Sequence, residues 1–284
     1  MLGLLTTATE QISKMKSLDP IAKQVSSWVS KATSPAAVKN ALSGTWLDHP
    51  LHPMATDVPI GAWTMATTLD VCGGESTQTA AQHLVGIGVL TSLPAAASGA
   101  SDWSDTIGKN RRIGLVHAVG NSVGTTMQVA SWCARRSGRH RLGVGLSFLG
   151  LGATMGATYL GGHLSFARGV NVNHTAFEAP VRKWTDVAAA DDVTEGQLVR
   201  VNANKTPVML TRHKGQLRAL SATCVHAGGA LDEGHIDKDC VVCPLHQSTF
   251  RLSDGKPVRG PATMEQPTWD VQTMDGRIQV KSAA

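Results

Sequence analysis

The sequence predicts a multidomain chain: an all-α four-helix transmembrane bundle followed by a small all-β domain of antiparallel strands. Three stretches of the first part contain no Asp, Glu, Lys or Arg: 76–101, 113–134 and 142–167. Each is long enough to cross a bilayer, which takes about 20 residues. Beyond residue 180 the pattern changes to short alternating stretches separated by turn signals such as Asp275-Gly276, as expected of a small β domain.

Residues 1–45 predict short amphipathic helices. Asp19-Pro20 marks a helix start and Gly44 marks a helix stop. The apolar side chains between them, including Trp28, fall on one helical face. This face can lie in the lipid–water interface, with Lys side chains toward the headgroups. The alternative is a helix packed on the following domain.

Residues 46–167 predict the four-helix transmembrane domain. The first apolar block, about 54–74, is interrupted by Asp57 and ends near Asp70, whereas the other three blocks are free of charge. All four are rich in Gly, Ala, Ser and Thr, which allow membrane helices to approach closely. Because the mean hydropathy of the chain is near neutral at −0.05, a buried soluble bundle is the rival interpretation.

The charge distribution indicates a lipid bilayer as partner rather than nucleic acid. The net charge of +5 is not gathered into a basic run with interleaved aromatic residues. Basic residues in the loops favour cytoplasmic termini, although the loop at 135–141 contains several arginines on the other side. We therefore expect a multi-pass protein of the cell membrane with its C-terminal domain in the cytoplasm.

Residues 168–180 form a polar tether, and residues 181–284 form the predicted β domain. Its expected strands are 198–202, 206–212, 215–221, 248–252, 268–273 and 276–281.

The chemistry of the chain is concentrated in the pattern C-x-H-x16-C-x-x-H, formed by Cys224, His226, Cys243 and His246. Two thiolates and two imidazoles suit a [2Fe–2S] cluster in which Cys holds one iron and His the other. One alternative is a Cys2His2 zinc site, although such sites usually open with two closely spaced Cys. Another pairs Cys240 with Cys243 and leaves the two histidines without clear roles.

The β domain resembles a Rieske domain over its whole length. The matching segments are CVHAGG at 224–229, CPLHQSTF at 243–250 and GPA at 260–262. The resemblance implies a Rieske-type sandwich with a cluster-binding subdomain, in which Cys224, His226, Cys243 and His246 are the ligands. It also implies that Pro261 lies in a loop over the cluster and that electrons leave through the histidine edge.

Departures from the family narrow this expectation. Gly229 and Leu245 occupy the positions of a disulfide found in cytochrome bc complexes, so the chain resembles the ferredoxin-like branch. Ser248 matches a serine that bonds a bridging sulfide, whereas Phe250 replaces a tyrosine that bonds a ligand sulfur. Loss of that bond predicts a potential in the lower part of the Rieske range of about −150 to +300 mV.

An oxygenase site is not expected in this chain. Rieske oxygenases also need a mononuclear iron held by two His and a carboxylate, and no His follows His246. We expect an electron-transfer component without catalytic residues of its own.

The membrane part opens with HPLHP at 49–53 and resembles an uncharacterised bacterial four-helix membrane family with an H-P-x-H-P motif. His52, His117 and His163 fall toward one membrane face, with Asp57 nearby. Ionisable groups at membrane depth often carry function, so these four residues form a candidate haem b or quinone site. The alternative is interfacial histidines bonded to backbone carbonyls.

Together these features predict a membrane-anchored Rieske protein that passes electrons between a quinol or haem donor and an unidentified redox partner. The competing prediction is a ferredoxin-like component that serves a separate soluble reductase or oxygenase, with the helices as a plain anchor.

Overall fold

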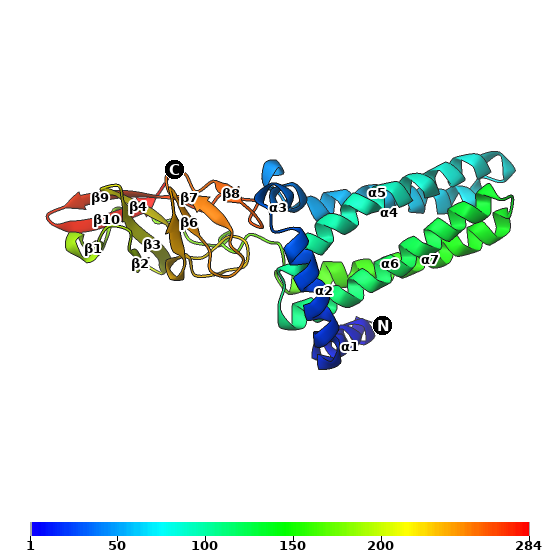
Figure 1. The fold of residues 1–284 in the computed structure, drawn as a ribbon, viewed down its shortest axis with the longest axis horizontal. Coiled ribbons are helices and arrows are strands. Elements are labelled where there is room, and N and C mark those ends of the chain that lie inside the picture. Colours follow the sequence, from blue (N-terminus) through cyan, green and yellow to red (C-terminus); the bar gives the residue numbers. More distant parts are fainter. Residues whose placement is uncertain (1, 284) are drawn as a thin grey trace. The chain divides into compact units, whose positions relative to one another are not determined.

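The computed structural model describes residues 2–283 and divides them into two compact units (Figure 1). One unit comprises the chain up to Ser34 together with Leu51–Val170, and the other comprises Pro35–Pro50 together with the chain from Asn171 onward. This division differs from the boundary expected at residues 45 and 46, because segment 35–50 bonds to a loop of the β unit.

The helical unit is built from six α-helices: α1 Leu2–Lys14, α2 Asp19–Ala32, α4 Leu51–Cys72, α5 Gln78–Ser104, α6 Gly108–Arg136 and α7 His140–Gly162. A π-helical turn, η4 His163–Ala167, follows α7, and short 3-10 turns lie at η1 Lys16–Leu18 and η3 Glu75–Thr77. The four expected apolar blocks thus correspond to α4–α7. Helices α4 and α5 pack as one hairpin, and α6 and α7 pack as a second.

Two of these helices have the composition of a membrane span. Segments Glu75–Ser104 and His140–Ala167 combine sufficient length with mean hydropathies of 1.4 and 1.2, and within residues 2–283 no other helix does so. Helix α6 falls short although its stretch 113–134 holds no charged residue, because His117, Asn121 and Gln128 lower its mean hydropathy. Helix α4 contains Asp57 and Asp70. The expected four helices are present, and two of them meet the hydropathy expected of a span.

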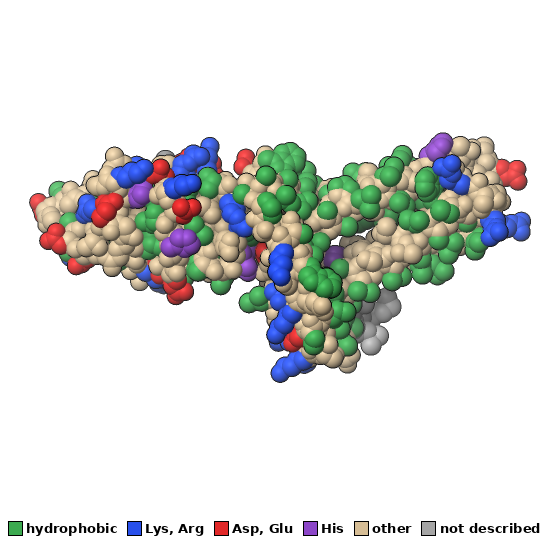
Figure 2. Space-filling model, viewed as in Figure 1, with side chains coloured by type: hydrophobic (Ala, Val, Ile, Leu, Met, Phe, Trp, Pro, Cys, Tyr) green, Lys and Arg blue, Asp and Glu red, His purple; other side chains and the backbone are tan. Residues whose placement is uncertain are grey.

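Most side chains buried in the helical unit are small or polar, and many of its large apolar side chains are exposed. Its fully buried positions include Ser98, Ser101, Gln128, Ser131 and Ser147. Its exposed positions include Leu90, Leu93, Ile107, Leu149 and Met155. Figure 2 shows hydrophobic side chains spread over the outer surface of both hairpins. This arrangement is the reverse of a soluble bundle.

Helix α2 begins at Asp19 with Pro20 in its first turn, as the sequence predicts. The helix buries Ala22 and Ser26, and Ser26 donates a hydrogen bond to Ser104 O at 3.1 Å. Its large apolar side chains are not the packed face, since Trp28 is 60% exposed. The small residues of α2 pack on the bundle and leave the aromatic ring outside.

The β unit contains three antiparallel sheets and ten strands: β1 Thr185–Ala189, β2 Leu198–Ala203, β3 Thr206–His213, β4 Gln216–Ser221, β5 His235–Asp237, β6 Cys240–Val242, β7 Thr249–Arg251, β8 Pro257–Arg259, β9 Trp269–Met274 and β10 Arg277–Ser282. The sheet orders are β1-β10-β9, β2-β3-β4 and β5-β6-β7-β8. All six expected strands are present. Strands β1, β5, β6 and β8 were not predicted, and β5, β6 and β8 are only three residues long.

The remaining short elements of this unit are α3 Ala36–Ser43, η2 Thr45–Leu47, η5 Ala190–Asp192 and η6 Leu231–Glu233. Gly44 ends α3 in the left-handed region at φ 90°, as its predicted role as a helix stop requires. One apolar core lies between the sheets around Leu210 and Ile278. A second core surrounds the two loops described next.

Candidate metal centre

Two similar loops present the Cys and His side chains of the pattern. The first follows β4 and contains Cys224 and His226, and the second joins β6 to β7 and contains Cys243 and His246. In each loop the cysteine carbonyl accepts a backbone bond from the residue four positions later, at 2.9 Å from Gly228 and at 3.0 Å in the second loop. Gly228 adopts φ 71°, a conformation that glycine takes without strain. The two loops therefore form locally, from residues that are close in sequence.

The two cysteine side chains meet in the interior. Cys224 is 1% exposed and Cys243 is 2% exposed, and their sulfur atoms are hydrogen-bonded to each other. The thiol of Cys224 and the backbone N–H groups of Leu245 and His246 lower the pKa of Cys243 to about 6. The bond to Cys243, followed by burial, raises the pKa of Cys224. The pair thus holds a thiolate, the form that binds metal.

The two imidazoles lie side by side at 5.1 Å between ring centroids, with an angle of 88° between their planes. Two imidazoles on one tetrahedral metal, at metal–nitrogen distances of about 2.0 Å, have centroids roughly 5 Å apart. Burial, followed by the charges of His246, Lys39 and His174, lowers the pKa of His226 to about 3. His226 is therefore neutral at physiological pH, as a metal ligand must be.

The arrangement fits two metal ions better than one. Within residues 2–283, no three His, Cys, Asp or Glu side chains converge on a single metal position. A zinc site needs four ligands around one ion, whereas a [2Fe–2S] cluster needs a Cys pair and a separate His pair. Cys240 lies in β6 opposite Arg251 of β7, outside both loops.

Gln266 supports the first loop and was not identified in the sequence. Its side-chain Oε1 accepts a bond from Val225 N at 3.0 Å, and its Nε2 donates to Ser221 O at 2.8 Å and to Thr223 O at 2.7 Å. Gln266 is 1% exposed, and its bonds to Val225 and Ser221 are buried. No local pattern marks this residue, because its partners lie more than 40 positions away.

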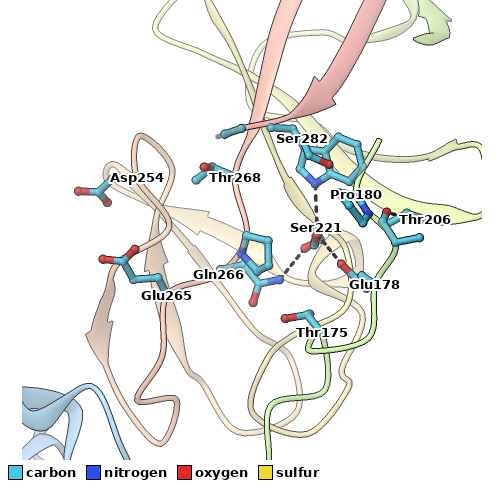
Figure 3. Close-up of a pocket in the computed structure, with 14 residues that line it drawn as sticks. Thr175, Glu178, Pro180, Thr206, Ser221, Asp254, Glu265, Gln266, Thr268 and Ser282 are labelled. Atoms are coloured by element: carbon cyan, nitrogen blue, oxygen red, sulfur yellow. Dashed lines mark hydrogen bonds between the residues drawn. The ribbon is translucent and has the colours of Figure 1, made fainter. Parts of the chain in front are cut away.

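A pocket of about 390 Å³ adjoins this network (Figure 3). Ser221 Oγ donates to Glu178 Oε2 at 2.7 Å and accepts from Trp269 Nε1 at 3.1 Å. Burial raises the pKa of Glu178, and bonds from Ser221 and Thr223 oppose that rise. The pocket wall is thus joined by hydrogen bonds to the backbone of the first loop.

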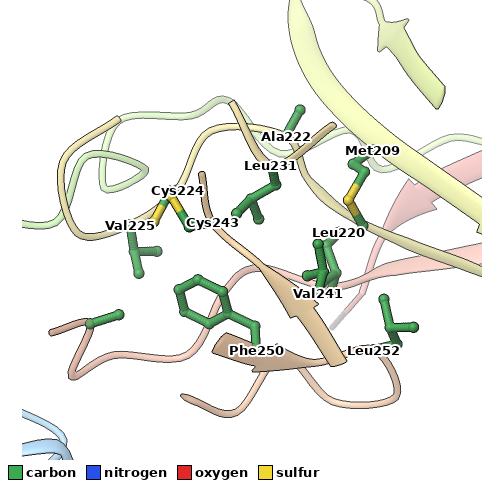
Figure 4. Close-up of a cluster of buried hydrophobic side chains, with 11 residues drawn as sticks. Met209, Leu220, Ala222, Cys224, Val225, Leu231, Val241, Cys243, Phe250 and Leu252 are labelled. Atoms are coloured by element: carbon green, nitrogen blue, oxygen red, sulfur yellow. The ribbon is translucent and has the colours of Figure 1, made fainter. Parts of the chain in front are cut away.

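The three supporting residues predicted from sequence lie around the loops. Ser248 is fully buried, and its Oγ accepts a bond from Ala262 N at 3.0 Å, next to the buried Pro261. Phe250 is also fully buried and packs in the core that contains both cysteines (Figure 4).

Segment 35–50 adds a further layer over the 258–262 loop. Asn40 donates to Val258 O at 3.1 Å and accepts from Gly260 N at 2.8 Å, and Thr45 Oγ1 donates to Ala262 O at 3.3 Å. One helical turn of this segment places Lys39, only 4% exposed, within electrostatic range of His226. No sequence pattern predicts this basic residue near the histidine pair.

The tether also contacts the centre. His174 N donates to Val225 O at 3.0 Å, and the His174 ring lies near Gly228. The opposite side of the second loop is more open, since Leu245 is 53% exposed beside the partly buried His246. An apolar, accessible histidine edge is suited to contact with a protein partner.

The predicted membrane site is assembled only in part. His52 and His117 lie 6.4 Å apart between ring centroids. His163 lies in η4, and Asp57 is exposed on α4. Within the described chain, no third His, Cys, Asp or Glu side chain joins His52 and His117 to form a metal site. Gly161 faces His117. His163 comes two positions later, which is a rotation of about 200° around a helix, so it lies on the side of the helix away from His117.

Comparison with known proteins finds a family match for the helical part and for the β part of the chain. Residues 183–273 match the family model described as Rieske [2Fe-2S] domain, and residues 48–174 match that described as Predicted membrane protein (DUF2231). The anthranilate 1,2-dioxygenase ferredoxin subunit of Burkholderia cepacia is 30% identical over 36% of this chain and 95% of its own length. Ferredoxin CarAc of Metapseudomonas resinovorans is 33% identical over 34% of this chain and 92% of its own length. A solved complex of reduced oxygenase and oxidized ferredoxin in carbazole 1,9a-dioxygenase contains a chain that is 32% identical, with a TM-score of 0.33, over 34% of this chain and 92% of that chain.

Proposed function

Because the chain belongs to the Rieske [2Fe-2S] family and carries a DUF2231 domain before its Rieske domain, we propose that it is a membrane-anchored electron-transfer protein. The observation that carries this proposal is the pairing of two buried cysteines with two perpendicular imidazoles 5.1 Å apart. When bound, a cluster of this type accepts and donates one electron.

The proposed ligands divide into two pairs. Cys224 and Cys243 hold one iron through thiolates that also accept backbone N–H bonds. His226 and His246 hold the other iron as neutral imidazoles. Ser248 fixes the loop that contains Pro261, and Phe250 fills the core beneath the cysteines. These residues position the ligands and exclude water.

The helical unit is proposed to span the membrane with all four helices α4–α7. Many of its large apolar side chains are exposed, whereas Ser98, Ser131 and Gln128 are fully buried, which is the distribution that a lipid environment favours. The inward polar groups bond to neighbouring helices, as in the pair formed by Gln128 Nε2 and Ser147 O at 3.1 Å. The basic loops favour a cytoplasmic Rieske domain.

Two electron routes are compatible with such a protein. In the first, a quinol or haem in the membrane supplies electrons that leave through the His226 and His246 edge. In the second, the chain is an anchored ferredoxin component for a separate soluble reductase or oxygenase. The second route is favoured by the relatives, which are ferredoxin components of dioxygenase systems. In both routes the partner docks at the accessible edge beside Leu245.

The two routes are separated by following the colour of the oxidised Rieske centre in membranes that contain the full chain. A short-chain quinol is added in one sample, and NADH with a ferredoxin reductase in the other. Bleaching by quinol in the wild type, but not in a His226→Ala control, supports the membrane relay. Bleaching by the reductase alone assigns the component role. Resistance of both samples to reduction, together with release of the protein by alkaline carbonate, contradicts a membrane electron carrier.

A further inference from the structure

We propose that His52 and His117 are the axial ligands of a b-type haem held between the α4–α5 and α6–α7 hairpins. The proposal names the membrane donor of the relay route, and it rests on the proposed function for the electron path but not for haem binding.

The two histidines are held in the same way on two different hairpins. His52 of α4 bonds through Nδ1 to Ala95 O of α5 at 2.9 Å, and His117 of α6 bonds through Nδ1 to Ala157 O of α7 at 2.7 Å. A backbone carbonyl only accepts, so Nδ1 of each ring carries the proton and the lone pair resides on Nε2. These bonds match the interfacial alternative considered from sequence, and they also orient a ligating imidazole, as bonds to metal-bound histidines generally do.

A glycine one turn after each carbonyl makes room for the ring. A Cβ on Gly99 would lie 2.5 Å from His52 Cε1, and a Cβ on Gly161 would lie 2.9 Å from His117 Cε1. Each histidine ring is thus held by the same arrangement: a backbone carbonyl that accepts its Nδ1–H, and a glycine four positions later that leaves space for the ring. The repeated arrangement fixes the orientation of both rings. Two interfacial histidines without a shared ligand would not require it.

The mutual placement of the rings agrees with trans ligation of one metal. Their centroids are 6.4 Å apart and their planes are 86° apart. Two metal–nitrogen bonds of about 2.0 Å, with about 1.1 Å from each nitrogen to its ring centre, place the centroids of trans imidazoles roughly 6.2 Å apart. The observed centroid separation is therefore close to the value that one iron atom between the two rings requires.

The surroundings favour haem over a bare metal ion. Within the described residues no third His, Cys, Asp or Glu joins the pair, so a free cation would lack protein ligands. A porphyrin supplies four nitrogens in the plane between two axial imidazoles. Figure 2 shows the surface hollowed between the two hairpins, which is where a flat, largely apolar group would lie.

Asn121 is the polar neighbour of this pair. Its Nδ2 lies 3.2 Å from His117 Nε2 and 3.1 Å from His117 O. The carbonyl remains a partner when the ring nitrogen binds iron, so Asn121 is not required as a ligand. It provides a matched variant close to the site.

The test is a reduced-minus-oxidised absorption spectrum of the purified full chain, produced in cells supplied with a haem precursor and then titrated with hemin. We expect a b-type α band and about one haem per chain by pyridine haemochrome. Because the ring planes are nearly perpendicular, ferric protein should give a strongly anisotropic low-spin electron paramagnetic resonance (EPR) signal with a large maximum g value.

His52→Gln and His117→Gln keep a donor for the carbonyl but should abolish the band, whereas Asn121→Ala and the exposed His83→Ala should retain it. The Rieske EPR signal, recorded in every sample, reports folding separately. Protein that keeps the Rieske signal but takes up no haem, or a band that survives both His→Gln substitutions, overturns this inference and leaves the proposed function intact. Loss of the Rieske signal from wild-type protein that binds haem overturns the proposed function alone.

Discussion

The side-chain oxygen of Gln266 accepts a hydrogen bond at 3.0 Å from the backbone N–H of Val225, the residue between two proposed cluster ligands. Gln266→Leu removes this bond and the two that its Nε2 donates to Ser221 O and Thr223 O. The loss at the fully buried Val225 N–H alone costs about 1–3 kcal/mol, and 1 kcal/mol corresponds to roughly 5 °C of melting temperature in a domain of this size. We expect the melting temperature of the Rieske domain to fall by roughly 5–15 °C in calorimetry of the full chain.

The matched control is Gln272→Leu, since the Gln272 side chain bonds to the side chain of Gln279 on the neighbouring strand and lies outside the cluster loops. An equal shift in both variants would show that Gln266 has no special role at the loop.

Lys39 provides a positive charge near His226. Reduction adds an electron to the cluster, and a nearby cation stabilises the reduced form. Lys39→Met should lower the reduction potential by an amount on the order of tens of millivolts, measured by a redox titration followed by circular dichroism. Lys256→Met, which removes a solvent-exposed lysine from the same unit, should change the potential far less. A raised or unchanged potential in Lys39→Met would rule out this electrostatic role.

Phe250 occupies a buried position in the same core as Cys224 and Cys243. Phe250→Tyr places a hydroxyl where it can donate to a ligand sulfur, and hydrogen bonds to sulfur raise the potential. We expect an increase on the order of tens of millivolts in the Tyr variant and a decrease in Ser248→Ala, both relative to wild type. Because the two reduction potentials should shift in opposite directions, a non-specific effect of substitution near the cluster cannot explain both results. Identical shifts in both variants would contradict it.

Glu178 makes a pH-dependent contribution to stability. Burial raises its pKa above the usual 4.5, so its protonated form is favoured in the folded state. The contribution is therefore fully present below about pH 4.5 and is lost as pH rises through the raised folded value. The stability difference between wild type and Glu178→Gln should shift against the wild type as pH increases from 4 to 7. Urea unfolding at several pH values tests this, and a difference independent of pH would refute it.

The cluster loops were predictable because their determinants are local. Cys224 and His226 are two residues apart, Cys243 and His246 are three apart, and each turn is closed by a bond within its own loop. The apolar blocks likewise predicted α4–α7, since helix length and composition are read directly from the chain. The short strands β5 and β6 escaped because three residues carry too little pattern.

The residues that surround the centre were not predictable because they come from distant parts of the chain. Asn40 and Val258 are 218 positions apart, yet they bond directly. In the sequence, Lys39 is indistinguishable from any other lysine of an amphipathic helix. Its place near the centre follows from the contact between α3 and the 258–262 loop. The sequence placed His52, His117 and His163 at one membrane face, but only the helix packing shows that two of them meet.

The most direct test of the central claim is EPR spectroscopy of dithionite-reduced membranes containing the full chain. We predict a Rieske-type [2Fe–2S] signal that is lost in His226→Ala and in Cys243→Ser and retained in the matched control Cys240→Ser, because Cys240 lies in β6 outside the ligand loops. A signal that persists in both ligand variants, or wild-type membranes that contain the protein but show no such signal, would contradict the assignment.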